Sequence, residues 1–257
     1  MFDLFNLLLL FIGAIGIGFV SAIAGIGGGS LMVPFMVLML NYDVRIAIAI
    51  SLLCVVVTSS TVASEYLKRG LVNIRIALLL EPITALGAIV GAYITLTLPD
   101  RLIKGALGLL LLYVSVTMLR RALKRAPPKS VTGEIPFFRK LLSVLVSFLA
   151  GLTSGMLGIG GGVLKVPLMT LILGLPIKVA VATSSFMVGL TAASGGMVYL
   201  MRGLVDPLSV IALASGIIPG ATLGAKYMRR LKPWAVRLVF SFILLYASIR
   251  LLYSILA

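Results

Sequence analysis

Histidine is absent from this chain of 257 residues, and cysteine occurs once, as Cys54. Without histidine there is no Ser-His-Asp or Cys-His catalytic arrangement, no histidine metal ligand and no histidine proton switch. A lone cysteine forms neither an intramolecular disulfide nor a cysteine metal cluster, and the apolar neighbours of Cys54 predict that it packs in the interior. The chain also lacks the phosphate-binding pattern GxxxxGK[ST], so nothing supports ATP-driven pumping. We therefore expect no enzymatic activity, no bound metal and no cofactor.

Charged residues are also scarce. They make up 11% of the chain, against about 25% in soluble domains, while 61% of the residues are hydrophobic and the mean hydropathy is +1.21. A membrane span needs roughly 20 apolar residues, and charge-free stretches of about that length or more lie at 4–42, 46–64, 141–164, 179–201 and 207–225. The sequence therefore predicts an all-α, multi-pass membrane protein. No basic residue precedes Arg45, so we expect the first apolar helix to be retained rather than cleaved as a signal peptide.

The net charge of +15 would be typical of a nucleic-acid-binding protein, but its placement indicates a membrane protein instead. Basic residues cluster between the apolar runs, at 68–75, 120–140 and 229–237. Cytoplasmic loops of membrane proteins carry this excess of lysine and arginine. We therefore expect the lipid bilayer as a partner and no nucleic acid.

The chain contains two copies of one unit, offset by 133 positions without a gap. GIGGG begins at Gly25 and again at Gly158, and RGLV begins at Arg69 and again at Arg202. Hydrophobic composition alone does not align two such motifs in one register, so we infer a duplication. The predicted organisation is a first transmembrane repeat at 1–122, a cytoplasmic linker at 123–138 and a second transmembrane repeat at 139–257.

Each repeat is predicted to contain one helix that ends at the glycine run, one short apolar segment and three longer helices. The expected ranges are 4–24, 31–40, 45–67, 74–96 and 101–119, then 141–157, 164–173, 178–201, 207–227 and 234–252. A continuous helix over 4–42 would be roughly 58 Å long, against a hydrocarbon core of about 30 Å. The chain must therefore break, and three consecutive glycines are the expected place, because glycine is a poor helix former and readily takes positive φ.

The loop charges predict that the two repeats have inverted orientations. The positive-inside rule places the linker and the 68–75 loop inside. In the second repeat the loop that matches 68–75 is weakly charged, and the strongly basic loop at 229–237 is the one that favours the inside. This exchange requires an odd number of crossings per repeat, with the short segment as a partial fifth crossing and both termini outside. The alternative is four crossings per repeat with GIGGG in a re-entrant loop, which leaves the 229–237 cluster outside.

Gly-interrupted helices at matching positions of inverted repeats indicate a substrate site near the middle of the membrane. Backbone groups freed by a break must face protein, water or a ligand, because lipid cannot hydrogen-bond them. The short segments begin just after the breaks, so helix N-termini, which favour anions, point toward them. The alternative is that glycines only permit close helix packing, and this is the preferred interpretation for Gly87, Gly91, Gly220 and Gly224. The break residues that we take as candidates are Gly25, Gly27, Gly28, Gly29, Gly158, Gly160, Gly161 and Gly162.

Lys165 lies directly after the second glycine run, where the first repeat has Met32. A lysine in an apolar segment either faces a cavity or a partner or extends to the membrane interface, and the sequence leaves both interpretations open. With a cation near the breaks, an anionic substrate is favoured over a cationic one. Because methionine occupies the matching position, we expect Lys165→Met to cost little stability.

Hydroxyl side chains supply further candidate ligands. Ser51 and the run of Thr183, Ser184 and Ser185 could bind an oxyanion, or could bond only to neighbouring helices or to their own backbone. Ser51 and Ser184 occupy matching positions in the two repeats, which favours this group over the other hydroxyls.

Two of the seven acidic residues matter for this prediction. Glu81 is the acid expected inside a helix, so it is the candidate carrier of a coupling proton. Glu65 precedes Lys68 and Arg69 by three and four residues, so a local helical ion pair is its simpler interpretation.

The glycine run with a proline five residues on occurs twice, as GIGGGSLMVP at 25–34 and GIGGGVLKVP at 158–167. This pattern, the length and the two-copy layout resemble the TauE/SafE (TSUP) family of membrane permeases over nearly the whole chain. The resemblance implies export or uptake of sulfur-containing anions, such as sulfite, sulfoacetate and other organosulfonates, by secondary transport in prokaryotic plasma membranes. We therefore expect a secondary transporter of a small anion, with H+ as the candidate coupling ion and a homodimer as a candidate assembly. The alternatives are a membrane scaffold or accessory subunit and a permease for a non-sulfur carboxylate.

Overall fold

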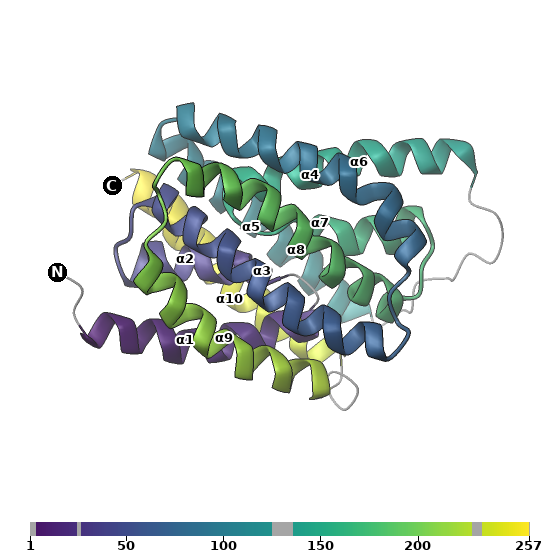
Figure 1. Ribbon diagram of the computed structural model, residues 1–257, viewed down its shortest axis with the longest axis horizontal. Helices are drawn as coiled ribbons and strands as arrows, with labels where there is room; N and C mark the ends of the chain where they lie inside the picture. Colours follow the sequence, from purple (N-terminus) through teal and green to yellow (C-terminus); the bar gives the residue numbers. More distant parts are fainter. Residues whose placement is uncertain (1–3, 25–26, 125–135, 228–232, 257) are drawn as a thin grey trace.

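The computed structural model describes residues 4–24, 27–124, 136–227 and 233–256. These residues form helices joined by short turns, with no strand among them (Figure 1). The predicted all-α class is confirmed.

The first half contains five helices close to the predicted ranges. They are α1 (Leu4–Ala24), α2 (Gly29–Met39), α3 (Val44–Lys68), α4 (Ile74–Thr97) and α5 (Asp100–Lys124). Side chains that the sequence places just before α3 and α4 cap them. The carboxylate of Asp43 accepts a hydrogen bond from the Arg45 amide at 2.8 Å, and Asn73 Oδ1 accepts one from the Ile76 amide at 3.2 Å. These caps satisfy N–H groups that a helix start leaves without a partner.

The second half repeats this series with one difference. Its helices are α6 (Phe137–Leu157), α7 (Gly162–Pro167), α8 (Ile177–Met201), α9 (Pro207–Tyr227) and α10 (Pro233–Leu256). The short segment after the glycines continues from α7 into a π-helical turn, η1 (Leu168–Ile172), so it has a wider final turn than α2. Either short segment is 11 residues long, which spans roughly 16 Å, about half of a bilayer core.

Helices of one half pack mainly on helices of the other. The principal pairs are α1 with α9, α4 with α6, α5 with α10 and α3 with α8. Glycines allow the first two pairs to touch backbone to backbone. A Cβ added at Gly87 or Gly91 of α4 would meet main-chain atoms of α6, and one added at Gly220 or Gly224 of α9 would meet main-chain atoms of α1. The packing interpretation of these four glycines is confirmed.

One hydrogen bond within the first half has a counterpart within the second half. Tyr66 donates to the Ala22 carbonyl at 2.9 Å, and Tyr199, its repeat counterpart, donates to Gly155 at 2.8 Å. In Figure 1, α1 begins at the end of the molecule where α10 finishes, whereas α6 begins at the opposite end. The two halves thus run in opposite directions through the bundle. The side of the membrane on which each end lies stays a prediction.

Within the part of the chain that the structure describes, five helices are long and apolar enough to cross a membrane: α3, α4, α5 through Arg120, α8 and α9. Large apolar side chains on their outer faces are exposed, such as Leu78 (64%) and Ile211 (68%). Lipid is the medium in which an apolar outer surface of this kind is stable. The interior is also apolar, and Cys54 lies buried in it as predicted.

Candidate functional site

Both glycine runs interrupt the helices, as predicted. Gly27 and Gly28 have φ values of 82° and 90°, and Gly160 and Gly161 have values of 76° and 72°. Residues with a Cβ rarely adopt these left-handed conformations, so the sequence needs glycine there. Gly25 lies outside the described residues.

The two breaks meet each other. A Cβ on Gly29 would clash with the carbonyl of Gly158 and would lie 2.8 Å from Ile159 Cα. Val55 of α3 and Val188 of α8, which are repeat counterparts, each lie against both Gly27 and Gly160. Two segments far apart in the sequence are therefore joined into one centre that the two halves share equally.

The centre lies halfway along the longest helices. Val55 is near the middle of α3, and Val188 is near the middle of α8. At 25 residues each, these helices are roughly 37 Å long and span a bilayer core. The breaks therefore lie level with the middle of two helices that are long enough to cross a bilayer, and unpaired polar groups at that depth would be costly.

Three hydroxyls next to the breaks have no hydrogen-bond partner in the described structure. One belongs to Ser30, which directly follows Gly29 and is fully buried. The other two belong to Ser21 of α1 and Ser154 of α6, which are repeat counterparts and are 1% and 0% exposed. Ser21 Oγ lies 3.0 Å from the position of a Cβ on Gly28, and Ser154 Cβ lies 3.4 Å from that of a Cβ on Gly161. Buried hydroxyls are normally bonded, so a matching pair of exceptions marks this place as unusual.

A buried ion pair lies beside the second break. Lys165 Nζ is 3.0 Å from Glu81 Oε2, and the two side chains are 1% and 7% exposed. Thr191 of α8 joins the pair, because its Oγ1 accepts from Lys165 Nζ at 2.5 Å and donates to Glu81 Oε1 at 2.5 Å. The three residues form a closed polar cluster, contributed by α7, α4 and α8.

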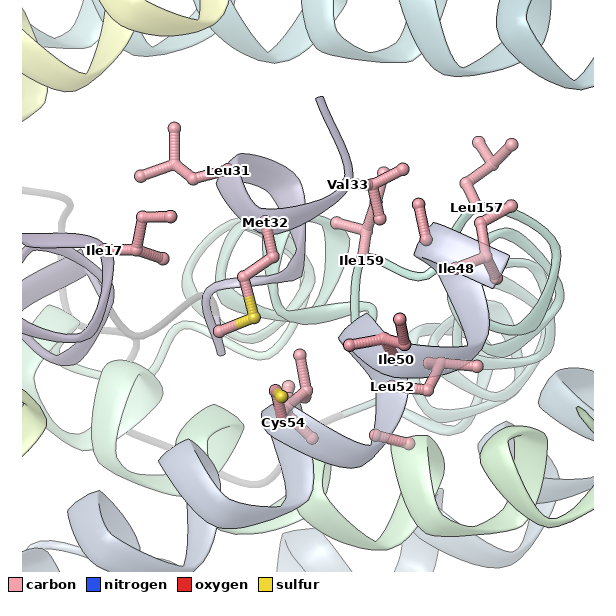
Figure 2. Packing of buried hydrophobic residues seen from close by; sticks show 14 of the residues in the cluster. Ile17, Leu31, Met32, Val33, Ile48, Ile50, Leu52, Cys54, Leu157 and Ile159 are labelled. Carbon is pink, nitrogen blue, oxygen red and sulfur yellow. The ribbon is translucent and has the colours of Figure 1, made fainter. Parts of the chain in front are cut away.

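The matching place in the first half is apolar. Met32, Ala214 and Thr58 occupy the positions that correspond to Lys165, Glu81 and Thr191. Figure 2 shows Met32 on α2 and Cys54 on α3 within one cluster of buried hydrophobic side chains. Thr58 donates to the Cys54 carbonyl at 2.9 Å, the same backbone bond that Thr191 can make to Met187 at 3.1 Å. The backbone of the two halves is nearly symmetric, but the buried charges lie beside the second break and have no counterpart beside the first.

The predicted hydroxyl residues divide into two groups. Ser51 lies at the centre, where it donates to the Gly158 carbonyl at 2.8 Å and so ties α3 to the second break. Ser184, its repeat counterpart, is fully buried. Thr183 instead accepts from the Asn73 amide at 2.9 Å, and Ser185 donates to the carbonyl of Val181 in its own helix at 2.9 Å. Both of these last bonds are structural.

The structure also decides between the interpretations that the sequence left open. Lys165 does not extend to an interface, because its side chain is buried and paired with Glu81. Glu65 of α3 pairs at 3.2 Å with Arg69, the residue that follows the last residue of this helix, which confirms the local ion pair. Thr191 was not among the predicted site residues. The repeat held a signal for it, because threonine also occupies the matching position, Thr58, although Thr58 makes its hydrogen bond within α3.

A surface groove lies between α4 and α6, away from this centre. Its lining is wholly apolar and contains Ile83, Phe138, Leu141, Leu142, Val144, Leu145 and Phe148. It has no group that could recognise a polar solute, so we assign it to the lipid-facing surface.

Known proteins are similar to this chain over nearly its whole length. The family model described as "Sulfite exporter TauE/SafE" matches residues 10–251. The chain is 28% identical to the "Probable membrane transporter protein YunE" of Bacillus subtilis, over 92% of this chain and 94% of that protein. It is 25% identical to the "Probable membrane transporter protein MJ0441" of Methanocaldococcus jannaschii, over 92% and 91%. A shorter match, 36% identical over 37% of this chain and 22% of the relative, is to "Sulfite exporter TauE/SafE family protein 6" of Arabidopsis thaliana. No solved structure matches.

Proposed function

The chain belongs to the sulfite exporter TauE/SafE family of membrane transporters, and from this premise we propose that it is a secondary transporter of a small anion, with a sulfur oxyanion as substrate. The family and the multi-pass helical architecture agree on transport across a membrane. The anion and its site are the part that we infer from the residues.

The observation that carries the proposal is the meeting of the two glycine breaks beside unpartnered hydroxyls and a buried cation. The glycines bring the two breaks into direct contact, so a ligand would reach their backbone groups when the two segments part. Ser21 and Ser154 offer two hydroxyl donors, one from each half of the chain, and Lys165 supplies positive charge from the second break. Hydroxyl and ammonium groups are the donors that an oxyanion binds, which favours an anion over a metal cation.

A sulfur oxyanion fits this set better than a planar carboxylate does. Its oxygens point in three or more directions, so it can accept hydrogen bonds from donors that converge from both halves of the bundle. The family description and the name of the Arabidopsis relative both refer to sulfite. A non-sulfur carboxylate is the competing substrate class.

We further propose that the transport is secondary and coupled to protons through Glu81, the acid buried in the cluster. A location in a prokaryotic plasma membrane, with both termini outside, follows from the loop charges and the family. A homodimer stays a prediction.

Reconstitution in liposomes tests the function directly. The purified protein should take up at least one of sulfite, thiosulfate, sulfoacetate and taurine, with a set of carboxylates measured in parallel. A thermal-stability screen with the same compounds should show stabilisation by the transported anion, since binding to the native state raises its stability. Uptake of carboxylates alone would change the substrate class, and a folded protein that transports none of the compounds would favour a scaffold.

Glycine variants make this test specific to the centre. Gly161→Val places a β-branched residue at a φ of 72°, and its Cβ would lie 2.9 Å from the Ala150 carbonyl oxygen. Gly16→Ala is the matched control, because it lies in α1 with open space around its Cβ position. We expect Gly161→Val to abolish transport while Gly16→Ala transports like the parent. Equal transport by both variants would show that the break is not part of the site.

A further inference from the structure

We propose that Glu81, Lys165 and Thr191 form a counter-ion switch, in which the transported anion replaces Glu81 as the partner of the Lys165 ammonium only when Glu81 has taken up a proton. This inference rests on the proposed anion transport. It adds a mechanism by which the binding of one anion is coupled to the binding of one proton, and it names the side chains that couple them.

The argument begins with the isolation of the pair. Lys165 Nζ and Glu81 Oε2 are 3.0 Å apart with almost no exposed surface. The other titratable groups with described side chains on α4, α6, α7 and α8 are Arg75, Tyr93, Arg139, Lys178 and Tyr199. The first four are exposed, and Tyr199 donates to the Gly155 carbonyl at 2.8 Å. Lys165 is therefore the charged group that faces Glu81.

Charge balance in the membrane interior then limits the states of the cluster. With Glu81 ionised and Lys165 protonated, the cluster is neutral and its ammonium is occupied. Adding an anion to that state would leave a net negative charge in a low-dielectric interior, which is costly. Adding a proton to Glu81 first frees the ammonium, and an anion bound there restores neutrality. Proton and anion binding are thus mutually favourable by the same free energy, whichever comes first.

Thr191 suits both states without moving. In the ion-paired state its hydroxyl donates to Glu81 Oε1. Once Glu81 carries a proton, the carboxyl can donate to Thr191 Oγ1, and the threonine hydroxyl can turn to the Met187 carbonyl, which is already 3.1 Å away. No buried hydroxyl is left without a partner in either state, which keeps the exchange inexpensive.

The cluster is also within reach of the glycine centre. Lys165 is the fourth residue of α7, which begins at Gly162, and helical side chains lean toward the N-terminus of their helix. Val188, which lies against both breaks, precedes Thr191 by one turn on the same face of α8, a rise of about 4.5 Å. An anion held between the breaks could therefore replace the Glu81 carboxylate at Lys165 Nζ.

The difference between the two halves sets the number of protons that accompany each anion. Because Met32 and Ala214 stand where the other half has Lys165 and Glu81, the described chain has one such switch. One proton per anion is the expected stoichiometry.

Proton uptake during anion binding tests the switch. Purified protein in weakly buffered, chloride-free detergent solution is titrated with methanesulfonate and with isethionate, which remain monovalent over the pH range, and a pH indicator reports protons. We expect about one proton bound per anion. Above the pH at which Glu81 ionises, Kd should rise about tenfold per pH unit, because the competent protonated fraction falls by that factor. Over the pH range in which Lys165 keeps its proton, binding in Glu81→Gln should be tighter than in the parent, independent of pH and without proton uptake.

A threonine pair provides the matched control. Thr191→Val removes the hydroxyl that contacts both charges, whereas Thr58→Val removes the hydroxyl at the matching uncharged place. We expect the pH dependence of Kd to be altered in Thr191→Val and to stay that of the parent in Thr58→Val. Equal shifts in both variants would contradict the assignment of Thr191.

The outcomes separate the switch from the transport function. Anion binding by the parent without proton uptake would overturn the switch and leave the transport function in place, and this measurement needs no variant to fold. Over the pH range in which Lys165 keeps its proton, binding by a folded Glu81→Gln protein that still takes up protons would overturn it too. If neither the two sulfonates nor any anion of the liposome screen binds the folded parent, the proposed function fails, and the switch fails with it.

Discussion

Removing the two charges of the buried pair one at a time and then together gives the sharpest test of the structure. Lys165→Met leaves the Glu81 carboxylate without its charged partner, and Glu81→Gln likewise leaves the Lys165 ammonium without one. Breaking a buried pair on one side typically costs about 3–5 kcal/mol, because an uncompensated charge remains in the interior. The double variant carries no charge there, and the amide oxygen that Glu81→Gln introduces can still accept the hydroxyl of Thr191.

The magnitudes make the comparison decisive. Two independent losses would sum to roughly 6–10 kcal/mol, whereas we expect the double variant to lose no more than about 3 kcal/mol, since neutral groups of similar size often replace a buried pair at little cost. The coupling energy between the two positions should therefore be at least about 3 kcal/mol. The free energies of unfolding of the parent, the two single variants and the double variant are measured in detergent with circular dichroism as the probe. If unfolding is irreversible, the four apparent Tm values at one scan rate are compared instead.

A second ion pair in the same chain is the control. Glu65 and Arg69 lie 3.2 Å apart, but their side chains are 24% and 26% exposed. The corresponding cycle, Glu65→Gln with Arg69→Met, should show coupling of at most about 1 kcal/mol, as for partly solvated pairs. If the losses from Lys165→Met and Glu81→Gln simply add, the two side chains do not form the buried pair, and the reasoning built on it is refuted.

Three further predictions concern binding, coupling and orientation. Ser21→Ala and Ser154→Ala should cost less than about 1 kcal/mol of stability, since neither hydroxyl has a partner to lose, yet each should weaken anion binding by roughly three- to tenfold; unchanged binding in a thermal-shift titration would remove both from the site. Glu81→Gln should retain exchange of anion across liposomes at equal concentrations but should fail to accumulate it in a proton gradient, and undiminished accumulation would contradict coupling through Glu81. In a Cys54→Ala background, single cysteines at both termini should react with an impermeant thiol reagent from outside, and one near Lys129, outside the described residues, should not; labelling of the termini on opposite sides would refute the inverted orientation.

The glycine breaks show how far the sequence could lead. An apolar run too long for one bilayer crossing and three consecutive glycines were enough to predict a break, and the left-handed φ values at Gly27, Gly28, Gly160 and Gly161 confirm it. This prediction succeeded because the cause is local: glycine lacks the Cβ that forbids positive φ. The close approach of Gly29 to Gly158 could not be predicted in this way, because it depends on how the two halves pack.

Lys165 shows where the sequence was insufficient. Aligned with Met32, it looked replaceable by methionine at little cost. The ion pair with Glu81, a residue 84 positions away, changes that expectation, since Lys165→Met would strand a buried carboxylate. The repeat alignment compares each residue with its counterpart in the other half, and it carries no information on which residue lies opposite in space.

The sequence by itself determined that the chain is a multi-pass membrane protein, that it is helical and where its helices break, because these follow from hydrophobic length, charge placement and the backbone preferences of glycine. It further predicted the duplication, from two motifs that recur in one register. It also identified Glu81 and Lys165 as unusual, since charge in an apolar helix is costly wherever it lies. Only the tertiary structure decided that these two side chains neutralise each other, that Thr191 bridges them and that the two breaks form one centre. The register between α4, α7 and α8 is fixed by packing across the two halves, and such contacts depend on the shapes of many side chains at once rather than on any local stretch of sequence.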